Sequence, residues 1–361
     1  MIMAGDFSAL VALRAKQGEF TALDEWDRVE QIRSVQPLLE LEPSSSPRKQ
    51  FAKVEEVARK LHQHGRHLMI DASDVAHVDG FGNGPAGALG ELADRLDGPA
   101  DLLGDYPVPF EPVVRCGLSN EELPACANLC EELGLGAAVR FRPAEDTKED
   151  LDRVLDKLRL DTPDLDLIID LQYVPEVTAA HTDRALKALR TVTTAGPFRS
   201  TTLLSGSIPP SLKEVSSPEQ PRTEEALWRL LNEEGSLELR LGDYGVVHPG
   251  PSTGFRSKHV SLKYSTSGRW AYSRQPIDEA TGDATTESPR AATLRAICRD
   301  LVDSDHYSGT QFSWGDREIA TASHDRGTKW GLPSRPVALA TSHHLAYLTA
   351  QTATAAHDDQ R

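Results

Sequence analysis

Short apolar runs alternate with segments of helical spacing along the first 250 residues of the chain. The runs are continuously apolar instead of alternating, which is typical of strands that are buried on both faces. Between them, start signals such as Ser46-Pro47 and the pair Thr147 and Asp150 predict helices. The pattern predicts strands at residues 7–13, 34–41, 67–72, 110–116, 136–142, 165–171, 198–205 and 236–242.

Strands buried on both faces and separated by helices are expected to form a parallel sheet that helices cover. Eight strands close a (β/α)8 barrel, which typically takes about 250 residues, and the units found here occupy about residues 7–250. We therefore expect an α/β protein in which residues 1–250 form a TIM-barrel-like (β/α)8 core. An open doubly wound sheet is the alternative, because periodicity does not show closure.

The pattern changes after residue 250. Residues 259–275 alternate and pivot on Ser267-Gly268, which predicts a β-hairpin. The polar stretch 276–289 is interpreted as a mobile loop, residues 290–303 return to helical spacing, and residues 345–361 are interpreted as an Ala/Thr-rich tail. We expect residues 251–361 to pack on the barrel as a C-terminal hairpin, loop and helical segment, within a single domain.

Polar and ionisable side chains stand at the carboxyl ends of the predicted strands, many in pairs two residues apart. Such pairs point to one side of a sheet, and the carboxyl end is the catalytic face of (β/α)8 barrels. A closed barrel would gather these groups at one mouth. They are Arg14, Lys16, Glu40, Glu42, Asp71, Ser73, Arg115, Arg140, Arg142, Asp170, Gln172, Ser205, Ser207 and Asp243.

Two kinds of chemistry fit this set. Guanidinium groups suit a phosphate or carboxylate, so the candidate ligand-binding residues are Arg14, Arg115, Arg140 and Arg142. Carboxylates serve as acids and bases or hold a divalent cation, so the candidate catalytic residues are Lys16, Glu40, Asp71, Asp170 and Asp243. No metal site and no cofactor is assigned beyond this option of a divalent cation.

A structural ion network is the alternative explanation of these charges, because the cations and carboxylates could neutralise one another. We favour a functional mouth, since an apolar layer would stabilise a barrel at least as well as buried ion pairs. Other motifs are weaker. The glycine-rich segment 77–87 is interpreted as a flexible barrel loop rather than an anion cradle. For His343-His344 a packing or hydrogen-bonding role is favoured over metal binding.

Composition narrows the function classes. The net charge of −16 disfavours general nucleic-acid binding, and no apolar stretch approaches the roughly 18 residues that span a bilayer. The start of the chain lacks a secretory signal pattern, so we expect a cytoplasmic protein. Free, buried thiols without zinc are expected for the four cysteines, Cys116, Cys126, Cys130 and Cys298.

Four segments resemble a known family: LRAKQGEFTAL (13–23), QPLLELEP (36–43), YSGTQFSWGDREIA (307–320) and SHHLAYL (342–348). In this order they are similar to the beta protein family of phages and prophages, over nearly the whole chain. The founding member of that family is linked to a phage-satellite cassette, where it counteracts a host-killing product. The resemblance implies a role in phage conflict and no particular reaction.

Two functions follow as hypotheses. The first is a protein that acts in phage defence or neutralises a toxic partner protein, with a charged mouth that binds a small anionic ligand. The second is a metal-assisted TIM-barrel enzyme that acts on a phosphorylated or nucleotide-like substrate. The sequence names no substrate, no toxin partner and no oligomeric state, and it does not decide whether the chain is an enzyme.

Overall fold

Eight parallel strands between Ala9 and Asp243 form a closed barrel, in the order β1-β2-β3-β4-β5-β6-β7-β9. The computed structural model describes residues 4–97, 107–214, 217–234, 238–251, 257–278 and 287–358. Closure confirms the predicted (β/α)8 fold and excludes the open sheet. The strands are Ala9–Arg14 (β1), Val35–Glu40 (β2), Met69–Asp71 (β3), Glu111–Arg115 (β4), Ala137–Phe141 (β5), Leu165–Tyr173 (β6), Ser200–Gly206 (β7) and Arg240–Asp243 (β9).

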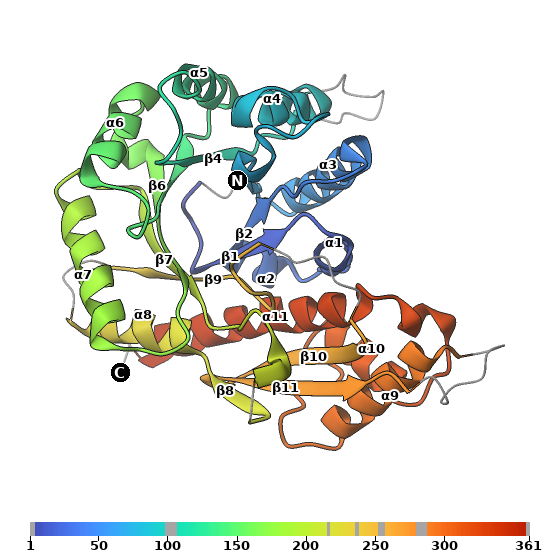
Figure 1. Ribbon diagram of the computed structural model, residues 1–361. Coiled ribbons are helices and arrows are strands. Elements are labelled where there is room, and N and C mark those ends of the chain that lie inside the picture. The colour runs from blue at the N-terminus through green and yellow to red at the C-terminus, as the bar shows by residue number, and fades with distance from the viewer. Residues whose placement is uncertain are drawn as a thin grey trace.

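Helices surround the barrel, as Figure 1 shows. Ser46 precedes the helix that begins at Pro47, and Thr147 and Asp150 form the predicted capping box. The helices are Gln17–Asp24 (α1), Val29–Ser34 (α2), Pro47–Gln63 (α3), Gly84–Leu96 (α4), Leu123–Leu133 (α5), Lys148–Leu158 (α6), Ala179–Thr193 (α7) and Thr223–Glu234 (α8).

Each barrel strand buries both of its faces, which explains why the apolar runs do not alternate. In β1, Leu10 and Ala12 belong to the cluster that fills the barrel, whereas Val11 and Leu13 pack against the surrounding helices. The inner cluster takes one or two residues from most strands, among them Leu38, Met69, Val113, Ala138, Ile168 and Leu204. The barrel is therefore a packed core, and its interior is closed below the mouth.

The chain after the barrel adds a small sheet and three helices. The predicted hairpin is present as His259–Thr266 (β10) and Arg269–Pro276 (β11), and β11 also pairs with Glu219–Pro221 (β8). Helices Pro289–Val302 (α9), Trp314–Ala322 (α10) and Arg335–Asp358 (α11) follow. In Figure 1, α11 lies between the barrel and the β10–β11 sheet.

The predicted tail at residues 345–361 is wrong, because α11 continues to Asp358. Leu345 and Leu348 are fully buried and share a cluster with the outward residues Val11 and Leu13 of β1. Burial of this face, together with the high helix propensity of alanine, favours a helix over a tail. The loop predicted at 276–289 lies mostly outside the described residues, which omit 279–286.

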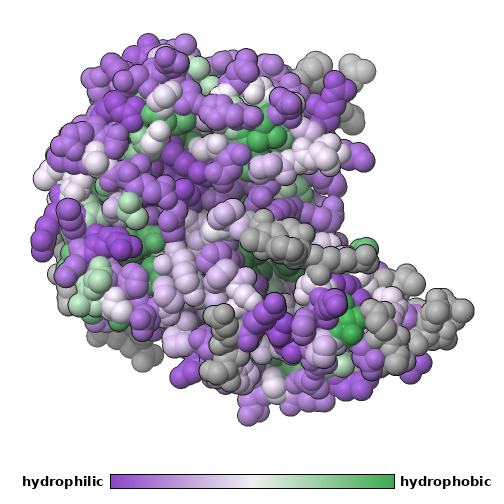
Figure 2. Space-filling model, viewed as in Figure 1, coloured by the Kyte–Doolittle hydropathy of each residue, from purple (hydrophilic) through white to green (hydrophobic). Residues whose placement is uncertain are grey.

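The surface seen in Figure 2 is mainly hydrophilic, with small separate hydrophobic areas. Among the described residues, the large hydrophobic side chains classed as exposed are Val29, Val177 and Leu332. Three such side chains are too few to make up an extended apolar patch of the kind that marks a docking face. No helix within the described parts of the chain is long and apolar enough to cross a membrane.

Candidate functional site

The carboxyl ends of the barrel strands carry ionisable side chains on the inner face of the sheet. In β5, Ala138 packs in the barrel interior and Arg140 follows two residues later, on the same side. The same offset places Glu40, Asp71, Arg115 and Asp170 after the interior residues Leu38, Met69, Val113 and Ile168. The strand pattern thus brings these five ionisable residues to one mouth.

Arg140 is the centre of this group and is fully buried. Its Nη1 donates to Glu40 at 2.7 Å and to Asp71 at 2.8 Å, and its Nε donates to Asp170 at 3.0 Å. Its Nη2 donates to the Tyr244 hydroxyl at 2.7 Å and lies 2.9 Å from Asp170. A guanidinium has five N–H donors, so every donor of Arg140 has a protein partner and none is left for a ligand.

Tyr244 and the chain that follows it lie over the centre of the mouth. Tyr244 comes directly after β9, belongs to the inner cluster and donates its hydroxyl to Asp170 at 2.6 Å. Lys263 of β10 donates to the Val246 carbonyl at 2.7 Å, and Arg14 donates to the His248 carbonyl at 2.8 Å. These contacts hold the chain after β9 against the barrel and shield Arg140 from solvent.

The electrostatics of the group follow from burial and from the arginines. Burial alone would raise the pKa of Asp71, but Arg115 and Arg140 outweigh it and hold this pKa well below its usual range. Burial would likewise raise the pKa of Asp170, but Arg140 and Arg142 outweigh burial and lower this pKa. Glu40 differs, because burial prevails and its pKa is raised. Asp71 and Asp170 are therefore stable anions at neutral pH.

Arg115 and Arg142 extend this network to an open cleft. Arg115 donates from Nε to Asp71 at 2.8 Å, and Arg142 donates from Nε to Asp170 at 2.9 Å. Both arginines line a cleft of about 250 Å³, which we call the arginine cleft, and Ser73 lines it with them. The Arg115 Nη2 and the Ser73 hydroxyl are buried atoms without a hydrogen-bond partner among the described residues. Two residues that line this cleft therefore each carry a buried polar atom without a partner.

Arg14 and Lys16, which the sequence placed in the same mouth, form a separate group. Their side chains lie 3.1 Å and 3.2 Å from the Glu42 carboxylate. The Arg14 side chain is 7% exposed and that of Lys16 is 41% exposed. Arg14 follows the interior residue Ala12, but in the described structure neither Arg14 nor Lys16 bonds to Arg140, so these two cations form a rim beside β1 and β2.

Asp243 lies on the other side of the barrel wall, which corrects the expectation that it joins the mouth. Tyr244 faces the interior, so its neighbour Asp243 faces outward. There Arg222 donates to the Asp243 carboxylate at 2.7 Å, and the His344 Nε2 lies 2.9 Å from it. The predicted strand ended at residue 242, one residue before the end of β9. The alternation of inward and outward positions was therefore not followed to Asp243 and Tyr244.

The paired histidines make hydrogen bonds, as the sequence favoured. The His344 Nδ1 lies 2.6 Å from the Ser265 hydroxyl, while its Nε2 meets Asp243. The His343 Nδ1 lies 3.0 Å from Asp316, and its Nε2 lies 2.8 Å from the Ser265 carbonyl. Ser265, His344 and Asp243 have the contacts of a nucleophile, base and acid, but each is at most 1% exposed. This burial favours a structural role, which ties α11 to β9, β10 and α10.

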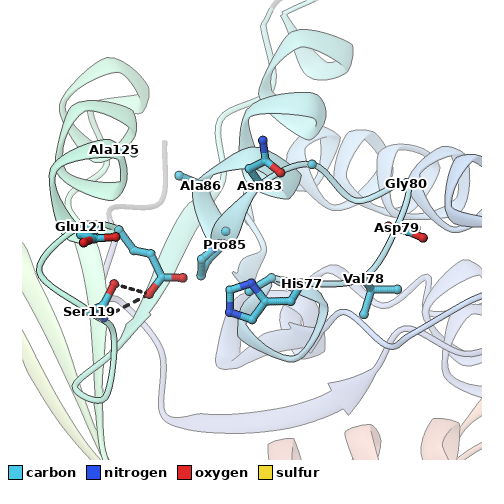
Figure 3. Close-up of a pocket in the computed structure, with 14 residues that line it drawn as sticks. His77, Val78, Asp79, Gly80, Asn83, Pro85, Ala86, Ser119, Glu121 and Ala125 are labelled. Atoms are coloured by element: carbon cyan, nitrogen blue, oxygen red, sulfur yellow. Dashed lines mark hydrogen bonds between the residues drawn. The ribbon is translucent and has the colours of Figure 1, made fainter.

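A larger cleft, of about 850 Å³, adjoins the arginine cleft. The glycine-rich segment 77–87 and the start of α5 line it, and the two clefts share Ala76, His77 and Glu122. Figure 3 shows His77 below Pro85, with Ser119 and Glu121 on the opposite side. Gly80, Gly82 and Gly84 have positive φ angles, which a side chain would strain. The segment therefore forms one wall of a shaped cleft.

The carboxylates of the mouth are occupied by arginines. No group of three or more His, Cys, Asp or Glu residues in the described parts of the chain has the geometry to hold a metal ion. Glu40, Asp71 and Asp170 all bond to Arg140 instead. The described geometry therefore favours anion recognition by arginine over the divalent-cation hypothesis.

Sequence reasoning missed Tyr244, Arg222 and Asp316 as parts of the buried networks. Tyr244 could have been found if the last strand had been extended to Asp243, since inward positions recur every second residue. Asp316 lies in the segment FSWGD, which was recognised only as a resemblance. Arg222 carried no signal, because its partners Glu224 and Asp243 are brought to it by the fold.

The fold and the site define a (β/α)8 barrel protein with a charged carboxyl-end mouth and an arginine-lined cleft at its edge. The model of the Beta protein family matches residues 11–350, nearly the whole chain. The chain therefore belongs to the Beta protein family, as the resemblance implied.

Two further comparisons were made. A search of curated proteins finds no match. Among solved structures, the chain is similar to alanine racemase of Clostridium difficile 630 in complex with cycloserine, with 13% identity and a TM-score of 0.30. That match covers 57% of this chain and 47% of the racemase chain, so the chain spans less than half of it. At this level of similarity the racemase says nothing about the site.

Proposed function

We propose that the protein binds a small anionic ligand at the arginine cleft, and that this binding serves phage defence or the neutralisation of a toxic partner. The observation that carries the proposal is the Arg115 side chain. Its Nε and Nη1 are held by Asp71 and Asp74, while its buried Nη2 has no partner in the described structure. A buried donor without a partner is costly, and an anionic oxygen would satisfy it.

The anchoring of the two guanidinium groups supports this proposal. Asp71 and Asp170 are fully buried and hold the Nε atoms of Arg115 and Arg142 at 2.8 Å and 2.9 Å. Fixed donors lose little side-chain entropy when a ligand binds. Because arginine stays protonated at all physiological pH values, the cleft keeps these positive groups under cellular conditions.

The biological role is inferred from the family. The founding member of the family that this chain resembles counteracts a host-killing product. We extend that role to this chain and place the ligand of the arginine cleft in it, as a small anion that the protein removes or senses, or as an anionic group of the toxic partner. The occupied carboxylates give no support to a metal-assisted enzyme.

The test combines a protection assay with direct binding. Arg115→Met and Arg142→Met are compared with Arg59→Met, a partly exposed arginine on α3 that pairs with Glu55 away from the mouth. Cells that carry each variant are challenged with phage or with a co-expressed toxin, and calorimetry measures binding of small carboxylates and inorganic phosphate. We expect folded cleft variants that lose binding and protection, while Arg59→Met keeps both. Folded cleft variants that keep full protection would refute the proposal.

A further inference from the structure

Carboxylates share the arginine cleft with the two arginines. Glu122, Glu145 and Asp146 line it together with Arg115 and Arg142. An anion without a positive group would meet repulsion from these carboxylates, and a cation alone would meet it from the arginines. A ligand with both charges would match both sides of the cleft.

The three carboxylates differ in the hydrogen bonds that they already accept from the protein. Glu145 accepts from Gln172 at 2.9 Å, and its other oxygen lies 3.5 Å from Arg142. Asp146 accepts the backbone N–H of Arg142 at 2.7 Å. In Glu122, Oε2 accepts from the Ser119 N–H at 3.1 Å and hydroxyl at 2.8 Å, as the dashed lines in Figure 3 show. The other Glu122 oxygen, Oε1, has no hydrogen-bond partner within the described parts of the chain.

The free oxygen of Glu122 lies at the junction of the two clefts. Glu122 lines both of them, and its Oε1 is 3.6 Å from the position that a Cβ on Gly84 would take. Gly84 belongs to the lining of the larger cleft. Ser119 fixes the carboxylate, so the free oxygen has a defined place between the arginines on one side and the larger cleft on the other.

We infer that the ligand of this site is zwitterionic, with an anionic group on Arg115 and Arg142 and an ammonium or other cationic group on Glu122. The inference rests on the proposed anion site and adds the second recognition group. The class of ligand is an ω-amino acid, an amino acid with a cationic side chain, or a molecule with the same two charges. The larger cleft leaves room for an extension beyond Glu122.

Calorimetry with matched probes tests the inference. The zwitterions are the ω-amino acids from 4-aminobutanoate to 8-aminooctanoate, because the series scans the separation of the two charges. Each is compared with the carboxylate and the primary amine of the same chain length. We expect at least one zwitterion to bind about tenfold more tightly than its matched carboxylate, and the amines to bind more weakly than both.

Two variants assign the effect to residues. Glu122→Gln keeps a hydrogen-bonding side chain and removes the charge, so it should abolish the preference for the zwitterion and leave carboxylate binding intact. Glu131→Gln is the control, because Glu131 lies in α5, the helix that Glu122 directly precedes, and its side chain is 78% exposed and lines neither cleft. It should change nothing.

The outcomes separate this inference from the proposed function. If carboxylates bind and every zwitterion binds no more tightly, the zwitterion inference is wrong and the anion site stands. The same conclusion follows if Glu122→Gln keeps the full preference. If no probe binds wild-type protein, or if Arg115→Met binds carboxylates as tightly as wild type, the anion site and the inference both fail.

Discussion

Removal of Arg140 should show whether the buried charges hold the barrel together. In Arg140→Met, Asp71 keeps Arg115 and Asp170 keeps Arg142, but Glu40 loses the side chain that binds it. Removing one partner of a buried ion pair typically lowers the free energy of unfolding by about 3–5 kcal/mol. With an unfolding entropy of about 2.1 cal/mol/K per residue, the 361 residues give about 0.76 kcal/mol/K. A loss of about 4 kcal/mol then lowers the melting temperature by roughly 5 °C.

The pH dependence gives a second, independent expectation. Burial already raises the pKa of Glu40, and without Arg140 only the smaller effect of Arg115 would oppose it. A carboxyl with a raised folded-state pKa is stabilising below its unfolded pKa of about 4.3 and loses that contribution as the pH rises. The stability gap between wild type and Arg140→Met should therefore be largest at pH 7 and narrow toward about pH 4.5.

Urea unfolding followed by circular dichroism at both pH values measures this gap. The double variant Arg140→Met/Glu40→Met serves as the control, because it removes the stranded carboxylate and should recover part of the lost stability. An Arg140→Met protein within about 1 kcal/mol of wild type at pH 7 would refute the reasoning. So would a gap that does not change with pH, or a double variant no more stable than the single one.

Three further predictions concern other parts of the chain. Gly315→Ala should destabilise by about 1–3 kcal/mol in urea unfolding, because its Cβ would lie 2.2 Å from the Leu339 carbonyl of α11. Burial raises the pKa of Glu111 well above its usual range, so the stability of wild type relative to Glu111→Gln should fall as the pH rises from 5 to 8. An opposite trend would refute this assignment. The thiols should react with a thiol reagent only after unfolding, because burial raises the pKa of all four cysteines, Cys116, Cys126, Cys130 and Cys298.

Local sequence pattern predicted the fold well because each barrel strand buries both faces. Even β3, with three residues from Met69 to Asp71, lay inside a predicted apolar run. β8 was missed, since Glu219–Pro221 is short and polar and exists only by pairing with β11. The helical end of α11 was missed because its burial depends on the outer face of β1, which is distant in sequence.

The site was predictable only in part, because it depends on which charges meet. The positions of Glu40, Asp71, Arg140 and Asp170 at the ends of predicted strands placed them in one group. The two-residue spacing predicted that their side chains point to the same side of the sheet. The spacing could not show that Arg140 has no free donor, or that Tyr244 lies over it. Those facts depend on a chain segment that returns across the barrel after its last strand. Only the hydrogen bonds of the folded chain show that Arg140 has no free donor and that Arg115 has one.

Three of the segments that carry the family resemblance contact α11 or belong to it. Gly18 approaches Val337, and Gly315 approaches Leu339, so closely that a Cβ on either glycine would overlap α11. His343 and His344 complete the attachment of this helix through Asp316 and Asp243. Residues 13–23, 307–320 and 342–348 therefore contribute to the joint between the barrel and its C-terminal part, whereas residues 36–43 include most of the barrel strand β2. The arginine cleft lies beside β4 and β5, so substitutions of Arg115 and Arg142 leave the contacts of α11 with Gly18, Gly315, Asp316 and Asp243 in place.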